Sequence, residues 1–286
     1  MPPTCGIMLN EASLIRDGPG SSASFVACIA GHLRSPDTVE NTVSALRKFV
    51  LDSDRRRAAV VIATWDVWGM QSPESKVRDC YDTRPLAKWR CPDEVAHCEV
   101  LPFAEHQEKL ALQHGCAHAG EGCHIRHISQ WFIIGRAFSL ALRSFRHATQ
   151  FLRLRPDTAL LQPIPVTSLV SSVVSYRNHF NWPGTGNDMV FLARRDGAWA
   201  ISHRMTHFVD AFNTTDQRGW SAAVQALKLV LPATNGHKMF NALEDLIPLF
   251  CSHMNLSFTI LNASTRLFYA LTMRRVAHCT VTAPRG

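Results

Sequence analysis

The chain has 286 residues, of which 46% are hydrophobic, and a formal net charge of +7 with its 14 histidines taken as neutral. This apolar share suits a globular protein with a buried core and excludes an intrinsically disordered chain. The positive charge suits an anionic ligand such as a nucleotide, but it is also common on solvated surfaces and identifies no partner. Nine cysteines are an odd number in a chain of this size, so no disulfide framework is indicated, although individual pairs can form.

The N-terminal part contains no apolar run long enough for a signal peptide or a membrane span. A Gly-Pro-Gly-Ser-Ser stretch indicates a flexible leader over 1–23, and we predict a single α/β domain over 24–286. On the sequence as given the expected compartment is the cytoplasm. Acceptor motifs for N-glycosylation at Asn213, Asn255 and Asn262 favour a lumenal location instead, such as the Golgi if an anchor is missing, so the compartment stays open.

A strand, a helix and a second strand are expected at the start of the domain. Residues 24–30 form a buried apolar run that ends at Gly31, which predicts a strand. Asp37 and Glu40 have the spacing of a helix cap and precede an apolar repeat of helical period. The β-branched run 58–64 lacks polar alternation, which is typical of a strand covered on both faces. This order predicts a parallel pair of strands.

The middle of the domain has a weaker pattern. Several prolines interrupt residues 72–122, where we expect a short strand at 98–103 and a polar helix at 105–113. A long amphipathic helix over 129–150 is then expected to lead directly into a strand at 151–154.

The last part of the chain continues this alternation. The expected elements are a strand at 171–177, a loop at 180–188, a strand at 189–193, helices at 198–212 and 237–252, and a strand at 256–261. The whole order predicts an α/β fold with a mostly parallel central sheet.

Polar turns follow three of the expected strands. Because ligands bind outside the carboxyl ends of parallel strands, these turns form the candidate site. A glycine lets a ligand approach the backbone, an arginine donates a fork of hydrogen bonds to phosphate, and an acid holds ribose hydroxyls or a divalent metal. Each residue also has a structural interpretation, such as an ion pair between an arginine and Asp157. The candidates are Gly31, His32, Arg34, Thr64, Asp66, Arg153, Arg155 and Asp157.

These motifs, in this order, resemble a glycosyltransferase-like family of algae, protists and large DNA viruses. The resemblance covers 25–199 and rests on Gly-His-Leu-Arg (31–34), Thr-Trp-Asp (64–66), Arg-Leu-Arg-Pro-Asp (153–157) and Gly-Asn-Asp (186–188). It implies a Rossmann-like, GT-A-type three-layer fold. It also implies transfer of a hexose-type sugar from a nucleotide-sugar donor to an unknown glycan, protein or lipid acceptor, with divalent Mn²⁺ or Mg²⁺ as cofactor.

The resemblance further implies a role for each motif residue. Gly31 and Arg34 would cradle the donor nucleotide, and Asp66 would lie near its base or ribose. Asp157 would hold the metal, and Asp188 would be the acceptor-side catalytic residue. The remaining donor-binding residues would be His32, Thr64, Arg153 and Arg155.

Pro156 gives a physical reason for the abrupt end of the strand at 151–154. Proline lacks a backbone N–H and fixes φ, so it ends the strand and directs Asp157 out of the sheet. Arg155 stands where an Asp-x-Asp element has its other acid, so Asp157 would be the metal's single protein carboxylate.

Two alternatives to the transferase hypothesis stay open. The turn after the first strand also resembles the phosphate loop of sulfotransferases, which binds an anionic nucleotide, although it lacks a lysine. A basic nucleic-acid-binding module would need arginines interleaved with aromatic residues, whereas the arginines here are scattered, so no nucleic-acid partner is expected.

A cysteine- and histidine-rich stretch at 116–127, with Cys91 and Cys98 upstream, offers ligands of the kind that zinc prefers. The spacings match no common zinc motif. We therefore interpret the stretch as a mobile surface loop.

Overall fold

The structure is a computed structural model. It describes residues 23–33, 36–48, 58–68, 85–86, 89–114, 125–160, 171–176, 190–212, 246–261 and 269–271. Several expected features lie outside these residues: all of the leader except Ala23, Arg34, the loop at 180–188 with Asp188, residues 237–245 of an expected helix, and residues 116–124 of the cysteine- and histidine-rich stretch.

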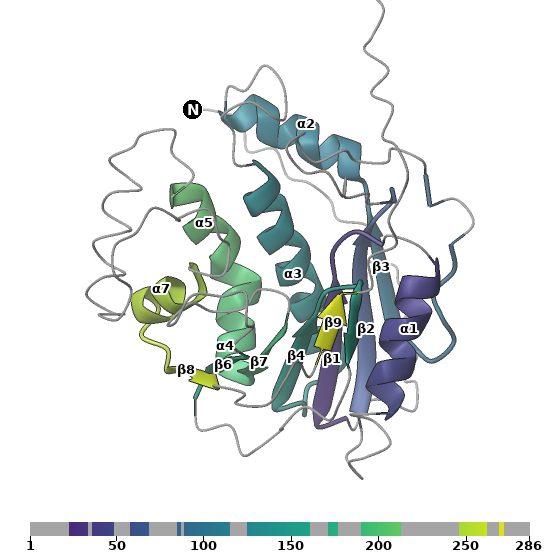
Figure 1. Cartoon of the computed structure of the whole chain (residues 1–286). Helices are drawn as coiled ribbons and strands as arrows, with labels where there is room; N and C mark the ends of the chain where they lie inside the picture. The colour runs from purple at the N-terminus through teal and green to yellow at the C-terminus, as the bar shows by residue number, and fades with distance from the viewer. Residues whose placement is uncertain are drawn as a thin grey trace, which may run out of the picture.

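Seven strands form one mixed sheet in the order β3-β2-β1-β4-β7-β6-β8 (Figure 1). The strands are β1 (Phe25–Ala30), β2 (Ala58–Trp65), β3 (His97–Leu101), β4 (Gln150–Leu154), β6 (Val173–Tyr176), β7 (Val190–Arg194) and β8 (Phe258–Leu261). Only β7 runs antiparallel to its neighbours, β4 and β6, whereas the other pairs are parallel. The predicted α/β fold with a mostly parallel sheet is confirmed.

Helices cover both faces of this sheet, which gives three layers (Figure 1). The helical elements are α1 (Pro36–Leu46), α2 (Phe103–His114), α3 (Ile125–Ser144), α4 (Arg195–Ala200), the π-helical segment η2 (Ile201–Met205), α5 (Thr206–Phe212) and α7 (Leu246–His253). Side chains of α1 pack in one core cluster, and those of α3, α4, η2, α5 and α7 pack in the other. Two short strands, β5 (Thr158–Leu160) and β9 (Tyr269–Leu271), pair beside α1.

All six residues of β1 are buried because this strand lies inside the sheet and supplies both cores. Its partners are in register, so Phe25 is opposite both Ala58 of β2 and Gln150 of β4. Alternate side chains then reach opposite faces: Val26 packs in the α3 cluster and Ile29 in the α1 cluster. Burial on both faces explains the absence of polar alternation in this sequence.

Two expected boundaries differ from the structure. The first helix begins at Pro36, before the expected cap, because proline is well tolerated in a first helical turn. The long helix ends at Ser144 instead of running into the next strand, and a turn closed by a hydrogen bond from Ala148 N to Phe145 O (3.0 Å) separates them. The β5–β9 pair was not expected.

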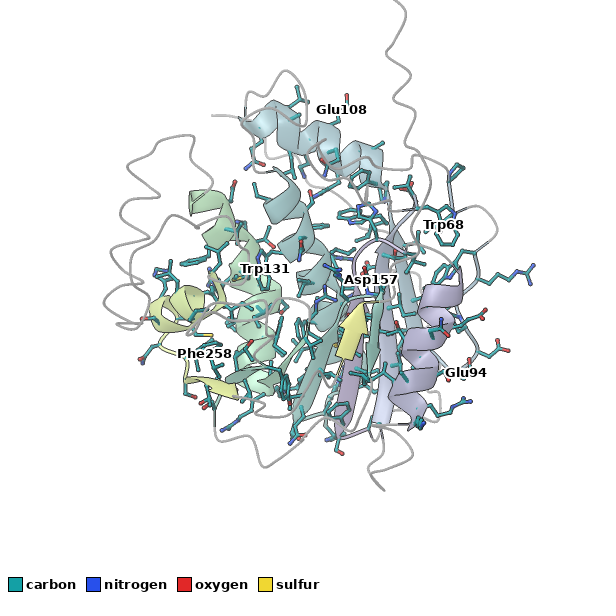
Figure 2. All side chains as sticks on the ribbon, viewed as in Figure 1. Trp68, Glu94, Glu108, Trp131, Asp157 and Phe258 are labelled. Carbon is teal, nitrogen blue, oxygen red and sulfur yellow. A yellow bond between two sulfur atoms is a disulfide. The ribbon has the colours of Figure 1, made fainter. Side chains whose placement is uncertain are left out.

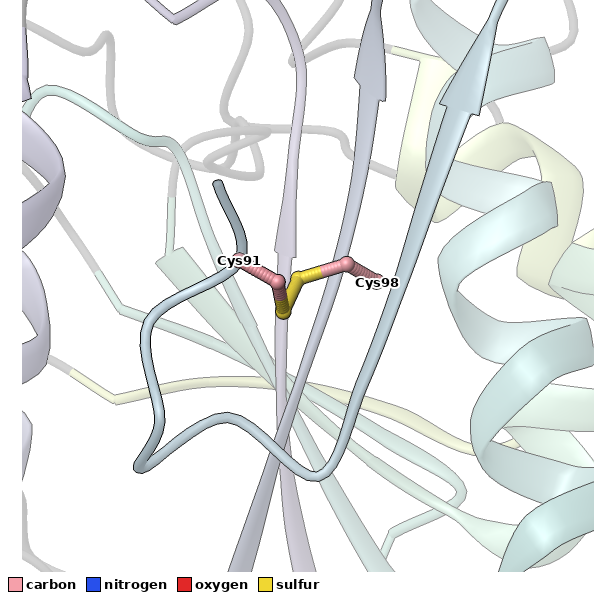
Figure 3. Close-up of a disulfide and its surroundings, with 2 residues drawn as sticks. All are labelled: Cys91 and Cys98. Atoms are coloured by element: carbon pink, nitrogen blue, oxygen red, sulfur yellow. A yellow bond between two sulfur atoms is a disulfide. The ribbon is translucent and has the colours of Figure 1, made fainter. Parts of the chain in front are cut away.

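A disulfide joins Cys91, in the segment before β3, to Cys98 within that strand (Figure 3). The two Cα atoms lie 6.0 Å apart. These cysteines are therefore not available as thiolates for the zinc site weighed above. Of the helices in the described ranges, none combines the length and the apolar character needed to cross a membrane.

The first four strands of the sheet have the 3-2-1-4 order of doubly wound folds. In that order the chain leaves β1 towards β2 and β3 on one side, and returns to β4 on the other. The point where the direction reverses, between β1 and β4, is where such sheets bind ligands. The carboxyl ends of β1, β2 and β4 lie side by side at the same end of the sheet, as predicted from the sequence.

Candidate functional site

Two of the predicted motifs meet at the switch point between β1 and β4. Gly31, directly after β1, has a φ of +126°, a backbone conformation that residues other than glycine rarely adopt. Its N–H donates a hydrogen bond to Ala63 O of β2 at 3.2 Å. A Cβ atom at this position would lie 3.3 Å from Cδ of Pro156, which follows β4. Glycine is therefore required both by the backbone conformation and by the closeness of the second turn.

Arg153 ties the ends of the same two strands together. Its side chain comes from β4 and is only 1% exposed. One guanidinium nitrogen donates to Ala30 O at 2.7 Å and also to Leu154 O. The paired register of β1 and β4 stops at Ile29 and Leu154, so the carbonyls beyond it need other donors. In this conformation the guanidinium stabilises the strand ends.

Asp157 lies fully buried near the middle of the molecule (Figure 2). Its carboxylate accepts two hydrogen bonds from Arg155, at 2.5 Å from Nε and 3.0 Å from Nη2. This is the ion pair that the structural interpretation of the motif anticipated. Among the described residues, no three His, Cys, Asp or Glu side chains gather into a group that could hold a metal. Both oxygens of the Asp157 carboxylate are bonded to Arg155, so a divalent cation could use them only if Arg155 moved away.

Thr42 of α1 holds this turn in place, a role that no sequence motif indicated. The side chain is fully buried, and its hydroxyl lies 2.7 Å from Pro156 O and 2.9 Å from Thr158 O. A further backbone hydrogen bond, from Thr158 N to Arg155 O at 3.0 Å, closes the turn. The position of Asp157 thus depends on a helix more than a hundred residues earlier in the chain.

Asp66, at the end of β2, caps a helix. Its Oδ1 accepts a hydrogen bond of 2.8 Å from the backbone N–H of Phe103, the first residue of α2. Such a contact satisfies one of the unpaired donors at a helix N-terminus. The backbone of Asp66 also bonds with Leu101 and Leu86. Thr64, two residues earlier in the sequence, is fully buried in β2.

An aromatic cluster flanks the turn after β1. His32 packs edge-on against Phe103 with ring centroids 4.7 Å apart, and it lies 6.1 Å from Trp65. Trp65 also contacts His106 at 4.8 Å, and His106 stacks on Phe132 at 4.4 Å. In the sequence, Trp65 is recognisable only as the middle residue of the Thr-Trp-Asp motif. No sequence pattern places His106 or Phe132 at this site. The cluster forms an apolar wall beside the switch point.

Burial of His106 lowers the pKa of its imidazole from 6.5 to about 4, and the charge of Lys109 acts in the same direction. The ring is therefore neutral near pH 7. A neutral ring suits the apolar surroundings, because charging it there would remove a cation from water without a compensating partner.

The structure thus brings five of the predicted residues together around the switch point: Gly31, His32, Arg153, Arg155 and Asp157. Thr64 and Asp66 belong to the adjacent strand. Arg34 and Asp188 are outside the described residues.

In comparisons with known proteins, no family model matches the chain, and no curated protein sequence matches it either. The likeness to glycosyltransferases therefore rests on the quoted motifs.

Replacing Asp66 tests whether its carboxylate is a cap or a ligand-binding group. Asp66→Ala is expected to lower the free energy of unfolding by about 1 kcal/mol, since it removes the acceptor for the α2 N-terminus. Asp66→Asn keeps an oxygen acceptor and is expected to keep most of the stability. Chemical denaturation of both variants measures this. Equal destabilisation by Asn and Ala would contradict the capping role, and loss of donor binding in a stable Asp66→Asn protein would add a ligand contact.

The lowered pKa of His106 predicts a pH dependence of stability. The unfolded chain takes up this proton near pH 6.5, whereas the folded protein resists it until about pH 4. The free energy of unfolding is therefore expected to decrease as the pH falls through this window. His106→Phe keeps an aromatic ring without the titrating group, so it should flatten that part of the profile. Denaturation at a series of pH values tests this, and an unchanged slope in the variant would rule out His106 as the cause.

Proposed function

We propose that this protein is a nucleotide-sugar-dependent glycosyltransferase that moves a hexose-type sugar to a glycan, protein or lipid acceptor. The observation that carries the proposal is the meeting of Gly31 with the Pro156–Asp157 turn at the switch point of the sheet. Doubly wound sheets bind nucleotides at this place. The motifs that resemble the transferase family supply the turns there.

The surroundings of Gly31 suit a diphosphate. The turn after Gly31 leads into α1, which begins at Pro36, only a few residues further on. The N-terminus of a helix carries unpaired N–H groups and a partial positive charge, which favour an anion. Arg34 lies between the two in the sequence and would add a charged donor. The donor's diphosphate is therefore assigned to the turn between β1 and α1.

The wall of His32, Trp65 and Phe103 would shield one side of the bound donor from water. These three rings come from the β1 turn, β2 and α2, so the wall is fixed by the sheet and by the cap that Asp66 provides. A low-dielectric wall strengthens hydrogen bonds to the phosphate groups.

The proposed reaction breaks the bond between the anomeric carbon and the phosphate oxygen of the donor, and it forms a bond from that carbon to an acceptor oxygen. The nucleoside diphosphate leaves with the electron pair, and the acceptor hydroxyl gives up its proton. Asp188 stays the predicted acceptor-side residue, and no residue is assigned to receive that proton. No step is assigned to a metal, because Asp157 is bonded to Arg155.

A thermal-shift panel of nucleotide-sugars, with and without Mn²⁺, tests the proposed function. A ligand that binds only the folded state stabilises it by about 2.7 kcal/mol when its concentration is a hundred times its Kd. One nucleotide-sugar is expected to raise the melting temperature. Arg34→Ala should weaken its binding by roughly 1.5–3 kcal/mol, the range for hydrogen bonds to charged groups. Arg204→Ala, at an exposed arginine of η2, is the matched control and should bind normally.

Two outcomes of this panel would overturn the proposal. If no nucleotide-sugar shifts the melting temperature, the site does not bind a donor. If only an adenosine phosphosulfate does so, the sulfotransferase alternative replaces the transferase.

Asp157→Asn tests the role of the buried acid. Because the substitution leaves Arg155 without its partner, we expect a loss of roughly 3 kcal/mol in the free energy of unfolding. A double variant, Arg155→Met with Asp157→Leu, removes both charges and should recover much of that loss. Denaturation measures both. Unchanged stability of Asp157→Asn together with loss of manganese-dependent donor hydrolysis would contradict the structural role and support a metal ligand instead.

A further inference from the structure

A second candidate binding surface lies at the opposite end of the sheet. Gln150 begins β4 and is paired with Arg194, which ends β7, so this end is remote from the turn at Pro156 and Asp157. A groove of about 820 Å³ opens there between the end of α3 and the start of α4. It is lined by Arg143, Thr149, Arg194, Asp196, Trp199 and His203, among others, and we name it the Trp199 groove.

Trp199 presents an exposed aromatic surface that is held in place. The side chain is 48% exposed, although it belongs to α4, whose neighbouring Ala198 and Ala200 are buried. His203 stacks on the indole with ring centroids 4.9 Å apart and an interplanar angle of 20°. The His203 Nδ1 atom is in turn 2.9 Å from the carbonyl of Trp199. The indole therefore has one supported face and offers a rigid apolar platform at low entropic cost.

The charge of the groove is mainly positive. Arg143, Arg194 and Arg195 line it, with Asp196 as the one acid among the lining residues. Arg194 and Asp196 are 3.8 Å apart and about half exposed, which makes their attraction weak. No acidic residue in the described parts of the chain pairs with Arg143. This excess of positive charge fits an anionic ligand.

The walls of the groove are tied to the fold. Arg195 donates to Ala148 O at 3.1 Å and to Phe145 O at 3.4 Å, and so joins the start of α4 to the turn after α3. The carboxylate of Asp196 accepts a hydrogen bond of 2.6 Å from Ser172. Arg195, Asp196 and the indole are therefore held in place without a ligand, which favours binding because less ordering is needed there.

We propose that the Trp199 groove binds an acidic oligosaccharide, a chain of sugar rings that carry carboxylate or sulfate groups. The flat C–H face of one ring would lie on the indole, and its anionic groups would accept hydrogen bonds from Arg143 and Arg194. The lining residues are half exposed, so the groove suits a segment of a longer chain, whereas pockets for small molecules enclose most of the ligand. Single-stranded nucleic acid is disfavoured, because its sites stack successive bases on several aromatic side chains and this groove has one exposed indole.

Calorimetric titration of the full chain with a sulfated hexasaccharide tests the proposal. The double variant Arg143→Ala with Arg194→Ala is expected to weaken binding at least about tenfold, and Trp199→Ala by a similar factor, as for central aromatic and arginine contacts. The matched control, Arg47→Ala with Arg90→Ala, removes the same charge elsewhere and should change affinity less than about twofold. All these side chains are at least partly exposed, so the melting temperatures should stay close to that of the unmodified protein.

Four results would overturn the proposal: no binding of the hexasaccharide, equal weakening by the control variant, equal binding of a neutral hexasaccharide, or tighter binding of an oligothymidylate. The rise in melting temperature that nucleotide-sugars cause in the Arg143→Ala and Arg194→Ala double variant keeps this test separate from the test of the proposed function. This rise should be normal if a donor site exists, since the groove is at the other end of the sheet.

Discussion

The buried guanidinium of Arg153, between the ends of β1 and β4, is the contact on which the candidate site depends. A charge inside a protein is costly unless it is hydrogen-bonded, and this one binds the carbonyls that the two strands no longer share. Its register partner on β1 is Cys28. Burial raises the pKa of that thiol far above its usual value, and the charge of Arg153 opposes the rise only in part, so Cys28 stays a neutral thiol. The strands can thus separate at the switch point without leaving their backbone groups unsatisfied.

The polar residues around this junction make hydrogen bonds within the protein that stabilise the fold. Arg155 and Asp157 bond to each other, Thr42 holds the turn that carries them, and Asp66 caps α2. A ligand at the switch point would therefore have to exchange these contacts, not fill vacant positions. Gly31 is different, because its role comes from the side chain that it lacks, which lets the turn at Pro156 lie close to its backbone.

The sequence was sufficient to predict the elements that carry a strong local pattern. The strands β1 and β2 are nearly continuous apolar runs, and β4 is an apolar stretch interrupted by Arg153. Glycine, a polar turn or proline follows each of them, and their predicted parallel order then located the edge of the sheet where their carboxyl ends lie. An apolar run does not indicate the direction of a strand within the sheet, so the antiparallel orientation of β7 was not predicted. The pairing of Arg155 with Asp157 could not be separated from metal binding, because the same two residues suit both. Arg143, Arg194 and Trp199 are scattered in the sequence, and only the pairing of β4 with β7 brings them to one groove.

The disulfide between Cys91 and Cys98 has a practical consequence for work on this protein. It encloses the segment that carries Glu94, whose carboxylate pairs with Arg47, the residue directly after α1. The same helix carries Thr42, which holds the turn at Pro156. Disulfides persist in oxidising surroundings and are reduced in the cytosol of most bacterial expression hosts. Protein purified from such a host would carry two free thiols and lack the covalent link between β3 and the segment before it, so its redox state should be stated with every binding constant measured on it.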